Sequence, residues 1–178
     1  MAPPLKLSSR NRRIALILGI VAIFGLFAGC SSSDPGQTGP VTVYLTNDGN
    51  ATHEFSVATV DGELGQNAVV INRRNKSVDY ASAGQGLGKH TYSRDYGYVT
   101  SLELPANRTE AVGTYTLNPN ETVQTNATEF DTGDTLVIVN RREDRIVTMI
   151  TANCNEASLN FVSVTASPND TFAGYFCG

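Results

Sequence analysis

Residues 41–60 read VTVYLTNDGNATHEFSVATV, a stretch that holds two strand patterns on either side of a turn. In 41–46 and again in 53–60, apolar residues alternate with polar ones, which is the two-residue period of a strand buried on one face. Between them lies Asn47-Asp48-Gly49-Asn50, and these residue types favour tight turns. The stretch therefore predicts a strand–turn–strand unit of a β protein.

The same pattern continues through the rest of the chain. Short runs rich in Val, Ile, Thr, Tyr and Phe recur between clusters of Gly, Pro, Asn and Asp, and no segment keeps a helical period. This spacing indicates an all-β fold, and we expect a single antiparallel β-sandwich over residues 41–178. The further strands are expected at 68–73, 77–81, 96–104, 111–117, 122–130, 136–140, 146–152, 159–166 and 171–177.

The first thirty residues indicate export. A basic head with Arg10, Arg12 and Arg13 precedes an apolar run of 15 residues, 14–28, and Gly29-Cys30 closes the run. A basic head, a short apolar run and a small-residue cleavage site are typical of a secretory signal peptide. Because a membrane-crossing helix needs about 20 apolar residues, we expect residues 1–29 to be a signal. An uncleaved anchor helix is the alternative.

The end of that segment, Ala28-Gly29-Cys30, resembles the lipobox of prokaryotic lipoproteins, with Phe27 at a position where that family usually has leucine. The resemblance implies that the Cys30 thiol is acylated and becomes the new N-terminus. The protein would then be held by membrane lipid on the extracytoplasmic face, with residues 30–40 as a polar, flexible tether. Residues 11–16 also resemble a twin-arginine signal, so the twin-arginine and general secretory routes both stay open.

The charge balance of the exported part is acidic. Removal of Lys6, Arg10, Arg12 and Arg13 with the signal leaves 9 of the 13 basic residues against 17 acidic ones, a net charge of about −8. Acid excess with few lysines resembles the bias of proteins from salt-loving archaea, since a negative surface resists association. Proteins that bind nucleic acid carry basic patches instead, so we expect no nucleic-acid partner.

The chain has three cysteines, and two of them are expected to form a disulfide. With Cys30 lipidated, Cys154 and Cys177 remain as a pair in an oxidising compartment. Their bridge would close a loop of roughly 24 residues, which contributes ~3 kcal/mol in the chain-entropy model. It would also fix the last strand to the rest of the domain.

Six Asn-x-Ser/Thr sequons follow the signal, each in a polar, turn-like stretch. Glycosylation of a cell-surface protein would explain them. A turn-rich composition alone would explain them equally. The asparagines are Asn50, Asn75, Asn107, Asn120, Asn126 and Asn169.

Residues 43–55, VYLTNDGNATHEF, resemble the first copper-ligand region of cupredoxins, and Gly174-Tyr175-Phe176-Cys177 resembles the strand that leads to that family's cysteine ligand. The resemblance implies a cupredoxin-like sandwich, with an immunoglobulin-like sandwich as the other candidate. A blue-copper centre needs two histidines and a thiolate. No histidine follows Cys177, and a disulfide would remove its thiolate. We therefore expect a likeness of fold without a metal or cofactor, and His53 is the single candidate copper ligand.

Little in the sequence favours catalysis. The two histidines, His53 and His90, are 37 residues apart, and no Gly-x-Ser-x-Gly elbow occurs. An enzyme would have to bring His53, Arg73, Arg141 and a tyrosine cluster to one concave pocket. That cluster, a candidate contact patch, consists of Tyr92, Tyr96 and Tyr98 with His90 and Arg94.

These observations predict a non-catalytic binding or structural module of the cell envelope. Its partner is expected to be an envelope protein or a glycan, in addition to the membrane lipid at Cys30. The alternative is a cupredoxin-like electron-transfer protein that binds copper through His53.

Overall fold

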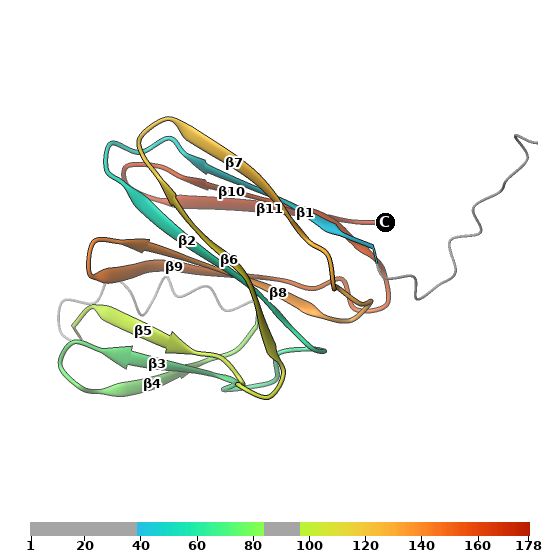
Figure 1. The fold of residues 1–178 in the computed structure, drawn as a ribbon. Helices are drawn as coiled ribbons and strands as arrows, with labels where there is room; N and C mark the ends of the chain where they lie inside the picture. The colour runs from blue at the N-terminus through green and yellow to red at the C-terminus, as the bar shows by residue number, and fades with distance from the viewer. Residues whose placement is uncertain (1–38, 84–96) are drawn as a thin grey trace, which may run out of the picture. The chain divides into compact units, whose positions relative to one another are not determined.

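The computed structural model describes residues 39–83 and 97–178, and in these ranges the chain forms eleven strands and no helix (Figure 1). Each of the eleven overlaps one of the expected strands, which confirms the all-β class. None of the described residues belongs to a helix long and apolar enough to span a membrane. The strands are β1 Val41–Asn47, β2 His53–Val60, β3 Val69–Arg73, β4 Val78–Ala81, β5 Val99–Glu103, β6 Thr109–Leu117, β7 Glu121–Ala127, β8 Thr135–Arg142, β9 Arg145–Ala152, β10 Leu159–Ala166 and β11 Thr171–Cys177.

The strands form three sheets. Sheet A has the order β11-β10-β1-β7, sheet B the order β6-β2-β8-β9, and sheet C the order β4-β3-β5. Antiparallel pairs dominate, and the expected sandwich is confirmed by the packing of sheet A on sheet B. The pair β1–β10 is parallel. These two strands come from opposite ends of the domain, so no hairpin sets their relative direction.

The first core lies between sheets A and B. Val41, Val43 and Leu45 of β1 point into it with no exposed surface, as their alternation with polar residues predicts. Phe55 of β2 and Val162 of β10 meet them from the two sheets. At roughly 25 cal/mol per Å² of apolar surface removed from water, such side chains supply most of the favourable free energy of folding.

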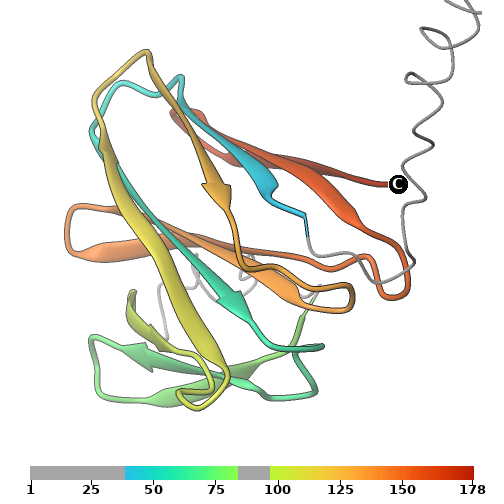
Figure 2. The ribbon, with the colours of Figure 1, turned by 45° about the vertical axis from the view of Figure 1, so that its right-hand side comes forward.

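A second core lies on the other side of sheet B, against sheet C (Figure 2). Leu136 and Ile138 of β8 belong to the first core, and Val137 between them belongs to the second. Val69 and Ile71 of β3 close the second core from sheet C. Because consecutive residues of a strand point to opposite faces, the middle of β8, residues 136–139, is apolar on both faces, and sheet B is the middle layer of three.

Candidate functional site

A buried polar network lies where β2 begins. His53 is 3% exposed, and its Nδ1 is 2.8 Å from Oδ1 of Asn140 on β8. Asn140 donates through Nδ2 to Oγ1 of Thr171 on β11, at 3.1 Å. The amide oxygen of Asn140 can only accept, so His53 Nδ1 carries the proton. The chain of bonds joins sheet A to sheet B at this end of the sandwich.

Asn47, at the end of β1, orders the turn beside this network. It is fully buried, and its Nδ2 donates to the carbonyl oxygens of Ala51, at 2.8 Å, and Leu117, at 2.9 Å. Its Oδ1 accepts from the backbone N–H of Gly49 at 2.9 Å. A Cβ on Gly49 would stand 2.9 Å from that oxygen, so glycine is needed there. The Asn-Asp-Gly-Asn stretch is thus a structural turn, as the sequence predicted.

The pocket at this network is small and polar. Its volume is about 140 Å³, below the roughly 300 Å³ at which ligand pockets usually begin. It lies between the start of β2 and the β10–β11 turn. Its lining residues are His53, Arg142, Val147, Ser167, Pro168, Asn169, Asp170 and Thr171.

The copper ligands suggested by the cupredoxin resemblance do not come together. Thr171 contacts the His53 network, and Cys177 lies six residues further along the extended strand β11, about 20 Å away at ~3.3 Å per residue. Cys177 is also bonded to Cys154. In residues 39–83 and 97–178, no three His, Cys, Asp or Glu side chains lie close enough to hold a metal ion. His53 acts there as a buried hydrogen-bonding residue.

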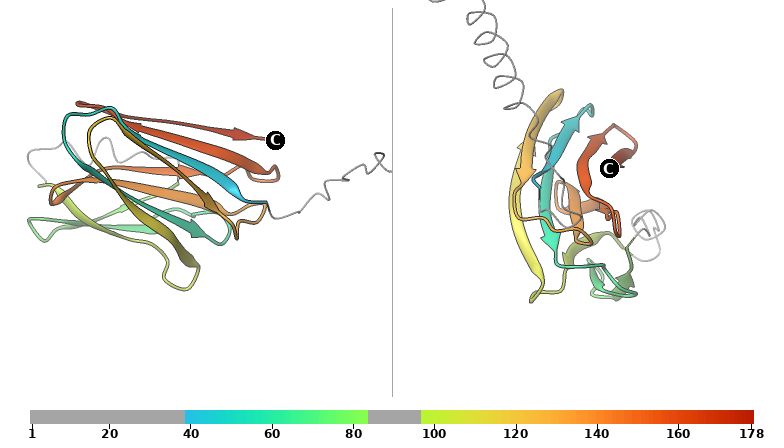
Figure 3. Two further views of the ribbon diagram at one scale, coloured as in Figure 1. Left: turned by 45° about the horizontal axis from the view of Figure 1, so that its top comes forward. Right: turned by 90° about the vertical axis from the view of Figure 1, so that its right-hand side faces the viewer.

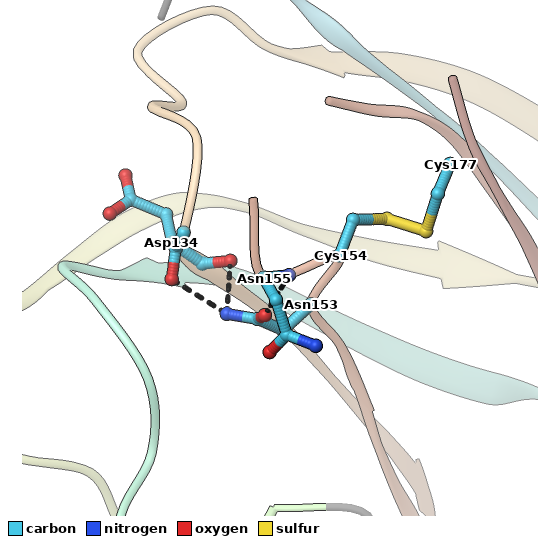
Figure 4. Close-up of a disulfide and its surroundings, with 6 residues drawn as sticks. Asp134, Asn153, Cys154, Asn155 and Cys177 are labelled. Atoms are coloured by element: carbon cyan, nitrogen blue, oxygen red, sulfur yellow. Dashed lines mark hydrogen bonds between the residues drawn. A yellow bond between two sulfur atoms is a disulfide. The ribbon is translucent and has the colours of Figure 1, made fainter. Parts of the chain in front are cut away.

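The expected disulfide is present (Figure 4). Cys154, in the segment after β9, is bonded to Cys177 at the end of β11, with 5.7 Å between their Cα atoms. The neighbouring Asn153 donates through Nδ2 to the carbonyl oxygens of Gly133, at 2.6 Å, and Asp134, at 2.9 Å. The disulfide thus joins β11 to a segment that is itself tied to the loop before β8.

The arginines considered for a pocket lie apart. Arg141 forms an ion pair of 3.6 Å with Glu54 across β8 and β2. Arg73 is the last residue of β3 in sheet C and is buried, and its Nη1 donates to the carbonyl oxygen of Gly97 at 3.0 Å. Arg73 thus belongs to sheet C, whereas His53 belongs to sheet B and lies at its hydrogen-bonded contact with Asn140.

The expected tyrosine cluster is described only in part. Tyr98 is 48% exposed, and the guanidinium carbon of Arg145 lies 5.1 Å from the centre of its ring. His90, Tyr92, Arg94 and Tyr96 lie outside the described residues, as does Cys30.

All six sequon asparagines are exposed. Asn126 is in strand β7, and the other five are in turns between strands, as their sequence context predicted. Each is therefore accessible to a glycan. The six are Asn50, Asn75, Asn107, Asn120, Asn126 and Asn169.

The outer face of sheet A carries a surface that the sequence analysis missed. Four large aromatic side chains point away from the core there, and their exposed fractions are 39% for Tyr44, 41% for Phe161, 61% for Phe172 and 53% for Phe176. The rings of Phe161 and Phe176 stack with 6.0 Å between centroids. We call these four residues the aromatic face.

The aromatic face lies on a sheet whose strands contain almost no charged residues. Within the four described strands of sheet A, Glu121 at the start of β7 is the single charged residue. Thr42, Thr46, Ser163 and Thr165 lie on the same face between the rings, and Thr122, Gln124 and the sequon residue Asn126 of β7 continue it beyond Tyr44. The sequence feature that could have revealed this face is TFAGYFC, residues 171–177. This stretch is uncharged, and the residues on both faces of the expected strand are mostly apolar.

No protein-family model matches the chain, and no curated protein matches it. One solved structure that resembles it is titled "Trapped Toxin", with 8% sequence identity and a TM-score of 0.32. The alignment covers 77% of this chain and 23% of that one, so this chain spans less than a quarter of its length. A likeness this weak has no bearing on fold or function.

Proposed function

We propose that this protein is a lipid-anchored, non-catalytic binding module of the cell envelope, and that the aromatic face is its contact surface. The anchor at Cys30 rests on the signal and lipobox pattern of the sequence. The contact surface rests on one observation, the four exposed aromatic side chains on a sheet whose strands contain one charged residue, Glu121.

Exposed aromatic residues in a cluster favour a binding surface over plain solvent exposure. Apolar patches rimmed by polar residues mark interaction sites on soluble proteins, and here Phe161 and Phe176 are in ring contact, with Tyr44 and Phe172 on the same face. Centres of interfaces are enriched in aromatic residues and depleted of charge, as the outer face of sheet A is. The exported part carries a net charge of about −8. A second acidic molecule is therefore repelled least at a face that carries no charge.

The same geometry favours binding over copper chemistry. A blue-copper centre needs a thiolate beside its histidines. Here His53 is hydrogen-bonded to Asn140, and Cys177 is bonded to Cys154 at the far end of β11. We propose an envelope protein or a glycan as the partner.

The test is photo-crosslinking in cells at native salt. A benzophenone amino acid replaces Tyr44, on the aromatic face, or Tyr80, which is 52% exposed on sheet C and serves as the matched control. We expect the Tyr44 position to give an adduct with an envelope component and the Tyr80 position to give none. Protease and glycosidase digestion of the adduct then separates protein from glycan. Equal labelling from both positions, or none from Tyr44, would contradict the proposal.

A further inference from the structure

Strand β11 is an open edge of sheet A. It pairs with β10 on one side, and no other strand of the described residues pairs with it on the other (Figure 3). Phe172 through Cys177 are all exposed. The strand is nevertheless held at both ends, by the Asn140–Thr171 hydrogen bond and by the Cys154–Cys177 disulfide. It is a fixed edge.

The backbone of β11 presents unpaired groups on that open side. Gly178 and Ser158 exchange both of their backbone hydrogen bonds, so Gly178 points toward β10. Because successive residues point to alternate sides of a strand, the N–H and C=O groups of Ala173, Tyr175 and Cys177 point away from β10. Such a row is a template for pairing with another chain.

The other edges of sheets A and B carry the features that normally prevent such pairing, which are charge, irregularity or cover. In sheet A, β7 begins with Glu121 and carries the Asn126 sequon. In sheet B, β6 contains Glu110 and a register shift opposite Val57 and Ala58. The last edge of sheet B, β9, begins with Arg145 and lies against β5. Strand β11 itself has no charged residue or proline, and the register shift in its pair with β10 places the extra residue, Asn160, on β10.

The sequence of β11 is self-complementary about its middle residue. Phe172 and Phe176 lie two residues on either side of Gly174, on the same face. In an antiparallel pair of two β11 strands centred on Gly174, Phe172 stands opposite the partner's Phe176, and Ala173 opposite the partner's Tyr175. The backbone N–H and C=O groups of Ala173 and Tyr175 point away from β10. In the centred register, the N–H and C=O of Ala173 therefore face the C=O and N–H of the partner's Tyr175.

Nothing within one copy requires glycine at position 174. A Cβ there would meet no atom within 4 Å, and Gly174 is not among the residues with positive φ. Glycine inside a strand lowers stability and often marks the close approach of another backbone. In the centred pair, the four Phe172 and Phe176 rings would flank the two glycines and cover them.

We propose that two copies of this protein pair through β11, antiparallel and centred on Gly174, so that their A sheets form one continuous sheet of eight strands. The contact is isologous, because each copy uses the same surface. It uses the edge of sheet A and leaves the outer face open, so the two aromatic faces become one larger surface. The pairing does not depend on the binding function proposed above.

The first test is disulfide trapping of the full chain in its own membranes. Gly174→Cys places a thiol on the proposed two-fold axis, where paired Cα atoms would be about 4.5 Å apart, within reach of a disulfide. Gln124→Cys, exposed on the opposite edge strand β7, is the matched control. After mild oxidation, we expect a product of twice the mass from Gly174→Cys alone. Monomer from Gly174→Cys, or equal dimer from both, would overturn the proposal.

The second test is disruption. Gly174→Lys has open space in one copy, but it would set two ammonium groups opposite each other in the pair. We expect the association constant of the detergent-solubilised full chain to fall by at least about tenfold, because like charges directly opposite are destabilising. Gln124→Lys should leave it unchanged. A dimer unaffected by Gly174→Lys would contradict the β11 pairing.

Discussion

His53 and Asn140 are 2.8 Å apart between Nδ1 and Oδ1, and both side chains are buried where β2 and β8 lie side by side. The contact gives a structural role to a histidine that resembles a metal ligand in sequence. Its proton is directed at an amide oxygen, and that amide is in turn bound to Thr171 of β11.

Removal of the central amide of this network should destabilise the domain. Asn140→Ala leaves His53 Nδ1 and Thr171 Oγ1 without their partner, and a buried polar group that loses its hydrogen bond costs about 1–3 kcal/mol. We expect a loss of that size in the free energy of unfolding, measured by urea denaturation. Thr52→Ala removes an exposed hydrogen bond to Asn118 and is the control. Equal losses for the two variants would contradict a structural role for the network.

The disulfide should matter both for stability and for the order of β11. Cys154→Ser with Cys177→Ser removes a link of sequence separation 23, and we expect the unfolding free energy to fall by ~3 kcal/mol. Amide hydrogen exchange should accelerate in β11 more than in β7, the other edge strand of sheet A. Unchanged exchange in β11 would mean that its pairing with β10 holds it without the disulfide.

The lipid anchor is tested at its acceptor residue. Cys30→Ser removes the thiol that would be acylated, so the protein should move from the membrane fraction to the medium. Fractionation and immunoblotting measure this, with Ser31→Ala as the matched substitution that keeps Cys30. Retention of the Cys30→Ser protein in membranes would support the uncleaved anchor helix.

Copper binding should be absent from the folded, oxidised protein. The thiolate of a blue-copper centre is missing when Cys177 is in its disulfide. Titration with Cu(II) followed by visible absorption should show no thiolate-to-copper band, and His53→Ala should titrate as the wild type does. Stoichiometric binding that is lost in His53→Ala would restore the electron-transfer alternative.

The sequence predicted the strands well because burial on one face leaves a period of two. Strand β1, with Val41, Val43 and Leu45 alternating with polar residues, is the clearest case. The disulfide was also predictable, since two cysteines remained after the lipid site.

Sheet pairing was less accessible to the same reasoning. The parallel contact of β1 with β10 joins residues more than a hundred positions apart, and no local pattern encodes it. The aromatic face was missed because alternation separates two faces of a strand without saying which one is covered. In β11 both sets are mostly apolar, so the pattern does not indicate which set is covered, and the strand lies at the rim of sheet A with Phe172 and Phe176 exposed.

Strand β8 has a consequence for how the domain comes apart. Its side chains fill two cores by turns, Leu136 and Ile138 on one side and Val137 on the other. A shift of the β8 backbone would withdraw side chains from both cores at once. Neither core can therefore lose the packing of β8 while the other keeps it. Three stacked layers should therefore melt in a single cooperative transition, with a calorimetric enthalpy equal to the van 't Hoff value.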